Sequence, residues 1–197
     1  LFNGQSKIED SFDVFNADDK RSRIFNRNTV TFLNSLNNKV FGFSSSDDTI
    51  NGQEGDDVIN GLSGSDLLRG GVGSDTIIGG KGNDTLVGGE GADQFQLNAP
   101  GMGIDIIEDF STLEGDVLIV ALQSFSSLIQ DELPIGVLEA ERFTLGNIAN
   151  SVNNRFVYNV STGQLFFDID GTGDTPQVQI AQLANGHNLN HADIQIF

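Results

Sequence analysis

The sequence predicts an all-β fold organised around a parallel β-roll, a solenoid in which tight turns and short strands alternate. Five consecutive nine-residue copies occupy residues 52–96, and each has Gly at places one and four, Asp at place six and an apolar residue at place eight. A degenerate copy at residues 43–51 keeps only Asp48 and Ile50 of this pattern. A fixed period of this kind indicates stacked repeats that bury a continuous core against their neighbours.

Each copy divides into a six-residue turn and a three-residue strand. The turn is rich in glycine because its backbone must adopt positive φ and approach an ion closely, which a Cβ would hinder. The strand has one inward side chain, at place eight, and these side chains form two facing rows: Ile50, Ile59, Leu68, Ile77, Leu86 and Phe95. Places seven and nine point outward, and four apolar residues there predict cover by the flanking segments or by a partner: Val58, Leu67, Ile78 and Val87.

The aspartates at place six predict a metal site between successive coils. Two copies make one coil, so residues 18 apart share an edge, with Asp48, Asp66 and Asp84 on one edge and Asp57, Asp75 and Asp93 on the other. Stacked strands lie about 4.8 Å apart, a spacing at which unpaired carboxylates repel each other. A hard divalent cation removes this repulsion, and Ca²⁺ suits a flexible cage of carboxylate and carbonyl oxygens better than Mg²⁺. Zinc is disfavoured because the repeats contain no His and no Cys.

The spacing allows at most four calcium sites, formed by the pairs 48/66, 66/84, 57/75 and 75/93, and the first is doubtful because Ser44 and Ser46 replace turn glycines. The candidate metal ligands are Asp48, Asp57, Asp66, Asp75, Asp84 and Asp93, of which Asp66, Asp75 and Asp84 carry most of the pairing. The candidate turn glycines are Gly52, Gly55, Gly61, Gly64, Gly70, Gly71, Gly73, Gly79, Gly80, Gly82, Gly88, Gly89 and Gly91.

Two simpler interpretations of the repeats compete with a calcium site. Aspartates commonly begin turns, but turn formation alone does not require Asp at every ninth residue. A phosphate-binding loop needs one glycine cluster before a helix and a Lys, whereas these repeats are periodic and acidic.

At these residues the sequence resembles the RTX (repeats-in-toxin) family of secreted bacterial proteins, and residues 88–95 resemble its closing copy. The resemblance implies calcium ligation through Asp at place six and through backbone carbonyls around the glycines. It also implies export of the unfolded chain by type I secretion machinery, followed by folding outside the cell, where calcium is abundant. The expected location is therefore secreted or at the cell surface, with a possible extracellular partner.

Composition agrees with this interpretation. The net charge of −18 divides into +1 for residues 1–41, −8 for residues 42–97 and −11 for residues 98–197. Four Ca²⁺ ions would cancel the charge of residues 42–97. A chain with this negative charge is not expected to bind nucleic acid. There is no cysteine, no apolar run long enough to span a membrane and no N-terminal secretory signal. The chain begins at Leu1, so we expect it to be part of something longer or processed.

Residues 1–42 are expected to form an N-terminal capping segment for residues 43–97, the roll itself. Ser6 and Glu9 fit a capping box and predict a short helix, and residues 29–33 predict a strand. The cluster Lys20, Arg21, Arg23 and Arg27 fits a solvated or internally paired face better than an acidic partner.

Residues 98–197 are expected to form a β-rich C-terminal cap. Alternating residues predict strands near 103–110, 115–120 and 177–180, and a hairpin over 155–170 with Phe156, Tyr158, Val160, Leu165, Phe167 and Ile169 on its buried face. This region resembles the segment that follows the roll in RTX proteins, which implies an uncleaved secretion signal.

Two acidic groups in the cap leave alternatives open. Asp105, Asp109 and Asp116 either complete a further calcium site at the exit of the roll or are solvated carboxylates at strand ends. Asp168, Asp170 and Asp174 partly fit an EF-hand loop, but Gln179 stands where the ligating Glu is needed, so a polar turn is favoured.

No catalytic constellation is found, and we expect no enzyme. The sequence has neither His-Glu-x-x-His nor Gly-x-Ser-x-Gly, and His187 and His191 are expected to be surface residues although a helix would place them on one face. The leading hypothesis is a secreted calcium-binding module that folds on calcium and serves as a structural or adhesive and secretion unit. The alternative is the C-terminal calcium-binding module of a secreted hydrolase, a protease or lipase, whose catalytic domain lies outside these residues.

Overall fold

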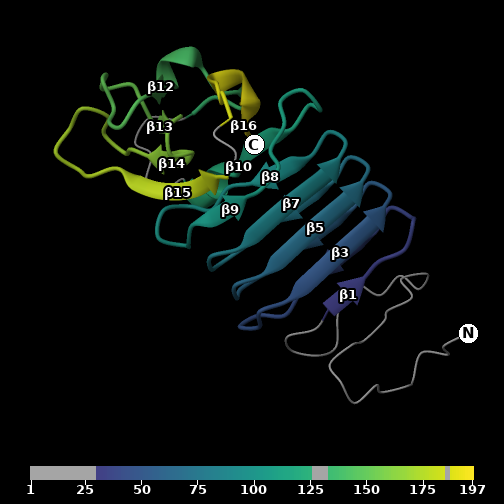
Figure 1. Cartoon of the computed structure of the whole chain (residues 1–197). Helices are drawn as coiled ribbons and strands as arrows, with labels where there is room; N and C mark the ends of the chain where they lie inside the picture. Colours follow the sequence, from purple (N-terminus) through teal and green to yellow (C-terminus); the bar gives the residue numbers. More distant parts are fainter. Residues whose placement is uncertain (1–29, 126–132, 185–186) are drawn as a thin grey trace, which may run out of the picture.

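The computed structural model describes residues 30–125, 133–184 and 187–197. Its strands form two sheets, and in the first half of the chain successive strands alternate between them (Figure 1). The nine-stranded sheet runs, in spatial order, β1 (Val30–Phe32), β3 (Thr49–Glu54), β5 (Leu67–Val72), β7 (Thr85–Glu90), β9 (Asp105–Ile107), β15 (Val178–Leu183), β14 (Gln164–Phe167), β13 (Phe156–Asn159) and β12 (Phe143–Leu145). The seven-stranded sheet runs β11 (Gly136–Val137), β16 (Ile194–Ile196), β10 (Val117–Val120), β8 (Gln94–Gln96), β6 (Thr76–Ile78), β4 (Val58–Asn60) and β2 (Lys39–Phe41).

The parallel register of the repeats confirms the predicted β-roll. Ile50 aligns with Leu68 and Leu68 with Leu86 in one sheet, and Ile59 aligns with Ile77 and Ile77 with Phe95 in the other. All six side chains are buried, with exposed fractions of 0–1%. Places seven and nine are mostly half-buried, as expected for the outer surface of a roll.

One detail of the predicted repeat is wrong. The strands β4, β6 and β8 have three residues, but β3, β5 and β7 have six and continue into the glycine-rich turn. Gln53 pairs with Gly71 and Gly71 with Gly89, so backbone pairing persists through the first places of every second turn.

The parallel stacking extends beyond residues 43–97 in both directions. Upstream, β1 pairs with β3 and β2 pairs with β4, which places Thr31 beside Ile50 and Val40 beside Ile59. Downstream, β9 pairs with β7 and β10 pairs with β8. The strand predicted over residues 29–33 is thus confirmed as β1, whereas the helix predicted near Ser6 lies outside the described residues. The limits 1–42, 43–97 and 98–197 remain a prediction about separate units.

The C-terminal residues continue both sheets of the roll. The predicted hairpin is confirmed, since β13 and β14 pair antiparallel and place Tyr158 opposite Leu165. The strand β15 pairs antiparallel with β14 and parallel with β9, while β16 pairs parallel with β10. One short helix, α1 (Leu122–Phe125), and two 3₁₀ turns, η1 (Ala140–Arg142) and η2 (His191–Asp193), connect these strands.

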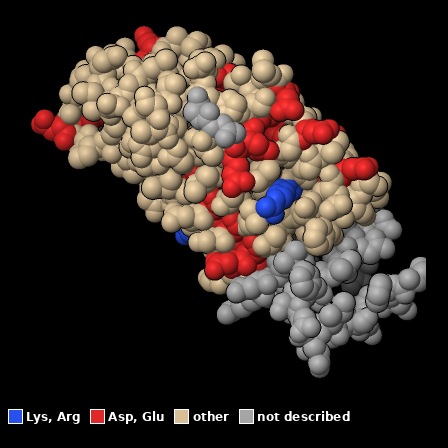
Figure 2. Space-filling view, viewed as in Figure 1, with Lys and Arg blue, Asp and Glu red and all other residues tan. Residues whose placement is uncertain are grey.

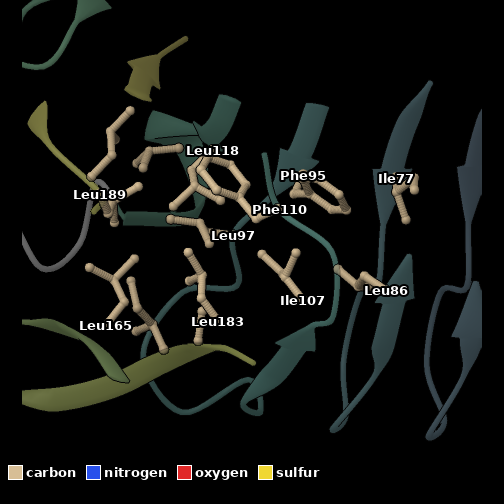
Figure 3. Close-up of a cluster of buried hydrophobic side chains, with 14 of the residues drawn as sticks. Ile77, Leu86, Phe95, Leu97, Ile107, Phe110, Leu118, Leu165, Leu183 and Leu189 are labelled. Carbon is tan, nitrogen blue, oxygen red and sulfur yellow. The ribbon is translucent and has the colours of Figure 1, made fainter. Parts of the chain in front are cut away.

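A single apolar core runs from the roll into the cap. Figure 3 shows the place-eight residues Ile77, Leu86 and Phe95 continuing through Ile107 and Leu118 toward the cap residues Leu165, Leu183 and Leu189. The hairpin contributes Phe156, Tyr158, Leu165 and Phe167, all buried as predicted, while Val160 and Ile169 pack against the core from partly buried positions. Among the described residues, no helix is both long enough and apolar enough to cross a membrane.

The stacked rows generate a direct test of the register. Ile77→Ala should lower the free energy of unfolding of the calcium-loaded chain by about 2–5 kcal/mol, because it leaves a cavity in a row where each coil has one inward side chain. Ile78→Ala is the matched control, since Ile78 is half-buried on the outer surface. Denaturant unfolding followed by circular dichroism measures both, and equal losses would contradict the assignment of inner and outer faces.

Candidate metal centre

The aspartates at place six form two hydrogen-bonded ladders along the roll. On one edge the backbone N–H of Asp48 donates to Asp66 Oδ1 at 2.7 Å, and that of Asp66 donates to Asp84 Oδ1 at 2.8 Å. On the other edge Asp57 donates to Asp75 Oδ1 at 2.7 Å, and Asp75 to Asp93 Oδ1 at 2.9 Å. The structure therefore brings together the four aspartate pairs expected from a separation of 18 residues.

In five of these six carboxylates the second oxygen has no hydrogen-bond partner. The Oδ2 atoms of Asp57, Asp66, Asp75, Asp84 and Asp93 are all unpaired, and the five residues are 0–2% exposed. Burying a carboxylate oxygen without a hydrogen-bond donor or a counter-charge costs free energy, so these atoms indicate a binding site for a cation. More acidic side chains gather on the exposed surface of the roll, which adds to its negative field (Figure 2).

At Asp57, Asp66 and Asp75 the unpaired oxygen lies near a backbone carbonyl of the next coil, across a space that only glycine leaves open. A Cβ added at Gly70 would collide with Asp75 Oδ2 and would lie 2.6 Å from the carbonyl oxygen of Gly88, in the next coil. A Cβ at Gly61 would meet Asp66 Oδ2 and the Gly79 carbonyl oxygen, the latter at 2.8 Å. Carboxylate and carbonyl oxygens are the donor set that Ca²⁺ takes in proteins, so these residues fit the ion.

The predicted turn glycines all lie in these stacked turns. Those at places two and four adopt positive φ: Gly55, Gly64, Gly71, Gly73, Gly80, Gly82, Gly89 and Gly91. The first two copies have no glycine at place two, yet Gln53 and Leu62 adopt the same left-handed backbone, with φ of 82° and 73°. Holding a residue other than glycine there costs about 1 kcal/mol or more, so the stacking of the turns overrides local preference.

The electrostatics of the ladder favour a nearby positive charge. Burial, reinforced by neighbouring carboxylates, raises the pKa of Asp57 to about 6 and those of Asp66 and Asp93 to about 7. Burial also raises the pKa of Asp75 and of Asp84. The ladder without a cation thus resists carrying its full charge at neutral pH.

Asp48 differs from the other predicted ligands. Its Oδ1 accepts a hydrogen bond from Ser46 Oγ at 3.0 Å, and its Oδ2 accepts one from the backbone N–H of Phe43 at 2.7 Å. Because both oxygens already have donors, the 48/66 pair has less need of an ion than the other three pairs.

The three acidic residues beyond the repeats do not converge on one site. Asp105 accepts from the backbone N–H of Asp84 at 3.1 Å and so continues the first ladder, whereas Asp116 accepts from Asp93 at 2.9 Å and continues the second. Asp109 accepts from the N–H groups of Gly88 and Gly89.

The repeat that contains Asp105 was missed in the sequence, although the signal was present. Gly101, Gly103, Asp105 and Ile107 keep places two, four, six and eight of the pattern. Pro100 stands at place one, and the three extra residues 97–99 break the nine-residue period.

The remaining candidates in the cap are engaged elsewhere. Asp168 Oδ1 accepts from the N–H groups of Asp170 and Gly171, as in the polar turn that the sequence favoured. His187 makes an edge contact with the ring of Phe110, and His191 Nδ1 lies 2.8 Å from the carbonyl oxygen of Leu138, so no common helix presents the two histidines. Within the described residues, no three His, Cys, Asp or Glu side chains gather as a metal cluster.

A parallel β-roll with stacked glycine turns and two aspartate ladders defines a calcium-binding repeat protein. Comparison with protein families finds the RTX calcium-binding nonapeptide repeat (4 copies) at residues 44–68 and 60–95. This part of the chain is therefore an RTX-type repeat region, and its repeats bind calcium. A search of the curated proteins finds no match to the chain.

The raised pKa values give the roll without calcium a predictable pH dependence. The buried carboxyls of Asp57, Asp66 and Asp93 have folded pKa values above the ordinary 3.8, so their contribution to stability is complete in acid and is lost as the pH rises through about 6 to 7. In chelator, the β signal in circular dichroism should therefore be greater at pH 5 than at pH 8. With saturating calcium the order should reverse, because protons compete with the ion. An unchanged signal in chelator across this range would contradict the electrostatic assignment.

Proposed function

We propose that the chain is a secreted module that folds when calcium enters the roll, and that it serves as a structural or adhesive and secretion unit. The observation that carries this proposal is the set of buried carboxylate oxygens without donors. Each turn from Asp57 to Asp93 has one, and turns 18 residues apart stack them along the same edge of the roll. Before calcium arrives, these charges oppose closure of the coils, and each ion that joins two turns removes part of this opposition. Binding and folding are then one process.

The proposed ligands are the place-six aspartates together with carbonyl oxygens of the glycine turns. Residues 42–97 have a charge of −8, which four Ca²⁺ would balance. The pairs 57/75, 75/93 and 66/84 have an unpaired Oδ2 on both members, so we propose them as the principal sites.

Folding that depends on calcium would serve a secreted protein. A chain that stays unfolded at the low calcium of the cytoplasm remains competent for a type I secretion channel, and it folds once calcium is plentiful outside. The lack of cysteine fits this route, because bound ions would stabilise a thin core in place of disulfide bonds. Half-exposed apolar side chains on the roll, such as Val72 at 50% and Ile106 at 42%, offer a surface for an extracellular partner.

We assign no catalytic role to these residues, since the family that matches is a calcium-binding repeat without catalytic function. The same folding mechanism would serve a hydrolase joined to this chain, but no specific feature of the described residues favours that alternative.

Calcium titration of the purified chain tests the switch. Far-UV circular dichroism should show a cooperative gain of β signal with Ca²⁺, because each ion joins neighbouring coils. Mg²⁺ is the control and should produce little change, since it prefers a tighter octahedral site. A chain that is fully folded in chelator at neutral pH would overturn the proposal.

The ladders also predict unequal losses at two aspartates. Asp75 is shared by the pairs 57/75 and 75/93, whereas Asp93 joins only one pair with unpaired oxygens on both members. Asp75→Ala should therefore lose about two bound calcium ions and Asp93→Ala about one, as ions occupy the space between stacked turns. Equilibrium dialysis measures the number of ions per chain, and identical losses would count against this stacking.

A further inference from the structure

We propose that the turn ending at Asp105, which lies outside the matched repeats, forms an additional calcium site with the turn of Asp84 at the junction between roll and cap. This inference rests on the proposed calcium-driven function. It extends the site to a turn whose sequence has lost both the nine-residue period and the glycine at place one.

The backbone of this turn repeats the geometry of the turns before it. Gly103 has φ of +134° and Gly82, one coil earlier, has +130°. A Cβ at Gly103 would collide with the carbonyl oxygen of Gly82, just as a Cβ at Gly82 would collide with that of Gly64. The N–H of Gly82 donates to the Met102 carbonyl at 2.8 Å, matching the bond from Gly64 to Lys81 at 2.9 Å. The insertion at residues 97–99 is thus absorbed before the turn, and the carbonyl stack continues.

Both carboxylates of this pair have a buried oxygen without a hydrogen-bond partner, as do those in the repeats. Asp105 is 1% exposed, its Oδ1 accepts the Asp84 N–H, and its Oδ2 has no partner. Asp84 is equally buried, and its Oδ2 is also unpaired. Two unpaired carboxylate oxygens on directly stacked turns, whose backbone carbonyls also stack, would supply oxygen ligands for a Ca²⁺ site.

The opposite edge of the roll lacks this arrangement at the same level. Asp116 Oδ1 accepts from the Asp93 N–H at 2.9 Å, but its Oδ2 accepts from the Ser111 N–H at 2.8 Å, so neither oxygen is left over. A Cβ at Gly115 would meet the side chain of Ala92 at 3.2 Å and no carbonyl oxygen. Asp105 and Asp116 look alike in the sequence, yet only Asp105 needs an ion.

An ion at this place would link the cap to the roll. Asp105 begins β9, which pairs with β7 of the repeats on one side and with β15 of the cap on the other. Ala181 of β15 lies opposite Asp105, so the carboxylate ladder ends at this strand. Calcium between Asp84 and Asp105 would fix the strand on which β15, and through it the hairpin of β13 and β14, is assembled.

The test compares Asp105→Asn with its matched control Asp116→Asn in the full chain, with calcium chloride as the ligand. Asparagine keeps an acceptor for the Asp84 or Asp93 N–H, so the ladder hydrogen bond survives. Equilibrium dialysis should show that Asp105→Asn binds one calcium ion fewer than the unsubstituted chain, whereas Asp116→Asn binds the same number. Equal numbers for all three chains, or a loss confined to Asp116→Asn, would overturn the inference. An unsubstituted chain that binds no calcium would instead refute the proposed function itself.

A second measurement reports on the cap alone. Tyr158 is the single tyrosine of a chain without tryptophan, and it is fully buried in β13. In the unsubstituted chain its fluorescence should change with calcium alongside the circular dichroism of the roll. In Asp105→Asn and in Asp105→Glu, which keeps the charge on a longer side chain, the calcium midpoint of the Tyr158 signal should shift at least several-fold relative to Asp116→Asn. Unshifted midpoints in both variants would contradict a calcium link between roll and cap.

Discussion

The hydrogen bond from the backbone of one aspartate to the carboxylate of the next governs the rest of this structure. It fixes the register of successive coils, because Asp57, Asp75 and Asp93 can be joined only when their turns stack directly. It also uses one carboxylate oxygen and leaves the other buried without a donor. The contact that orders the coils therefore also leaves a buried carboxylate oxygen available to a cation, and under the proposed function coil stacking would be coupled to calcium binding.

The apolar core of the roll is thin. Each coil has only two inward side chains, such as Ile77 and Leu86, because the turns consist mainly of glycine. In a solenoid of this kind each coil is stabilised chiefly by its two neighbours, so order spreads from coil to coil. Under the proposed function, ions that join adjacent turns would strengthen these neighbour contacts and so allow a thin core to support a cooperative transition.

Local and periodic features of the structure were predictable from the sequence, whereas long-range ones were not. The aspartate ladders and the rows through Ile59 and Leu68 follow from a separation of 18 residues. The extension of the roll to β1 and β9 was missed, because Thr31 replaces an apolar residue and residues 97–99 shift the period. The pairing of β15 with β9 joins residues far apart in the chain, and no local pattern encodes it. The difference between Asp105 and Asp116 depends on the N–H of Ser111, which a spacing argument cannot reveal.

The two sheets consequently pass from roll to cap in different ways. In the seven-stranded sheet the carboxylate of Asp116 is satisfied by backbone donors, and the passage from β8 through β10 to β16 is held by apolar packing, including Phe95 against Phe110. In the nine-stranded sheet the passage from β7 through β9 to β15 contains an unpaired, buried carboxylate at Asp105. Both passages share the apolar core, since Ile107 of β9 and Leu183 of β15 are buried in it. Only the passage through β9 would gain a further link from the proposed calcium ion between Asp84 and Asp105, and calcium would then influence cap residues that carry no repeats.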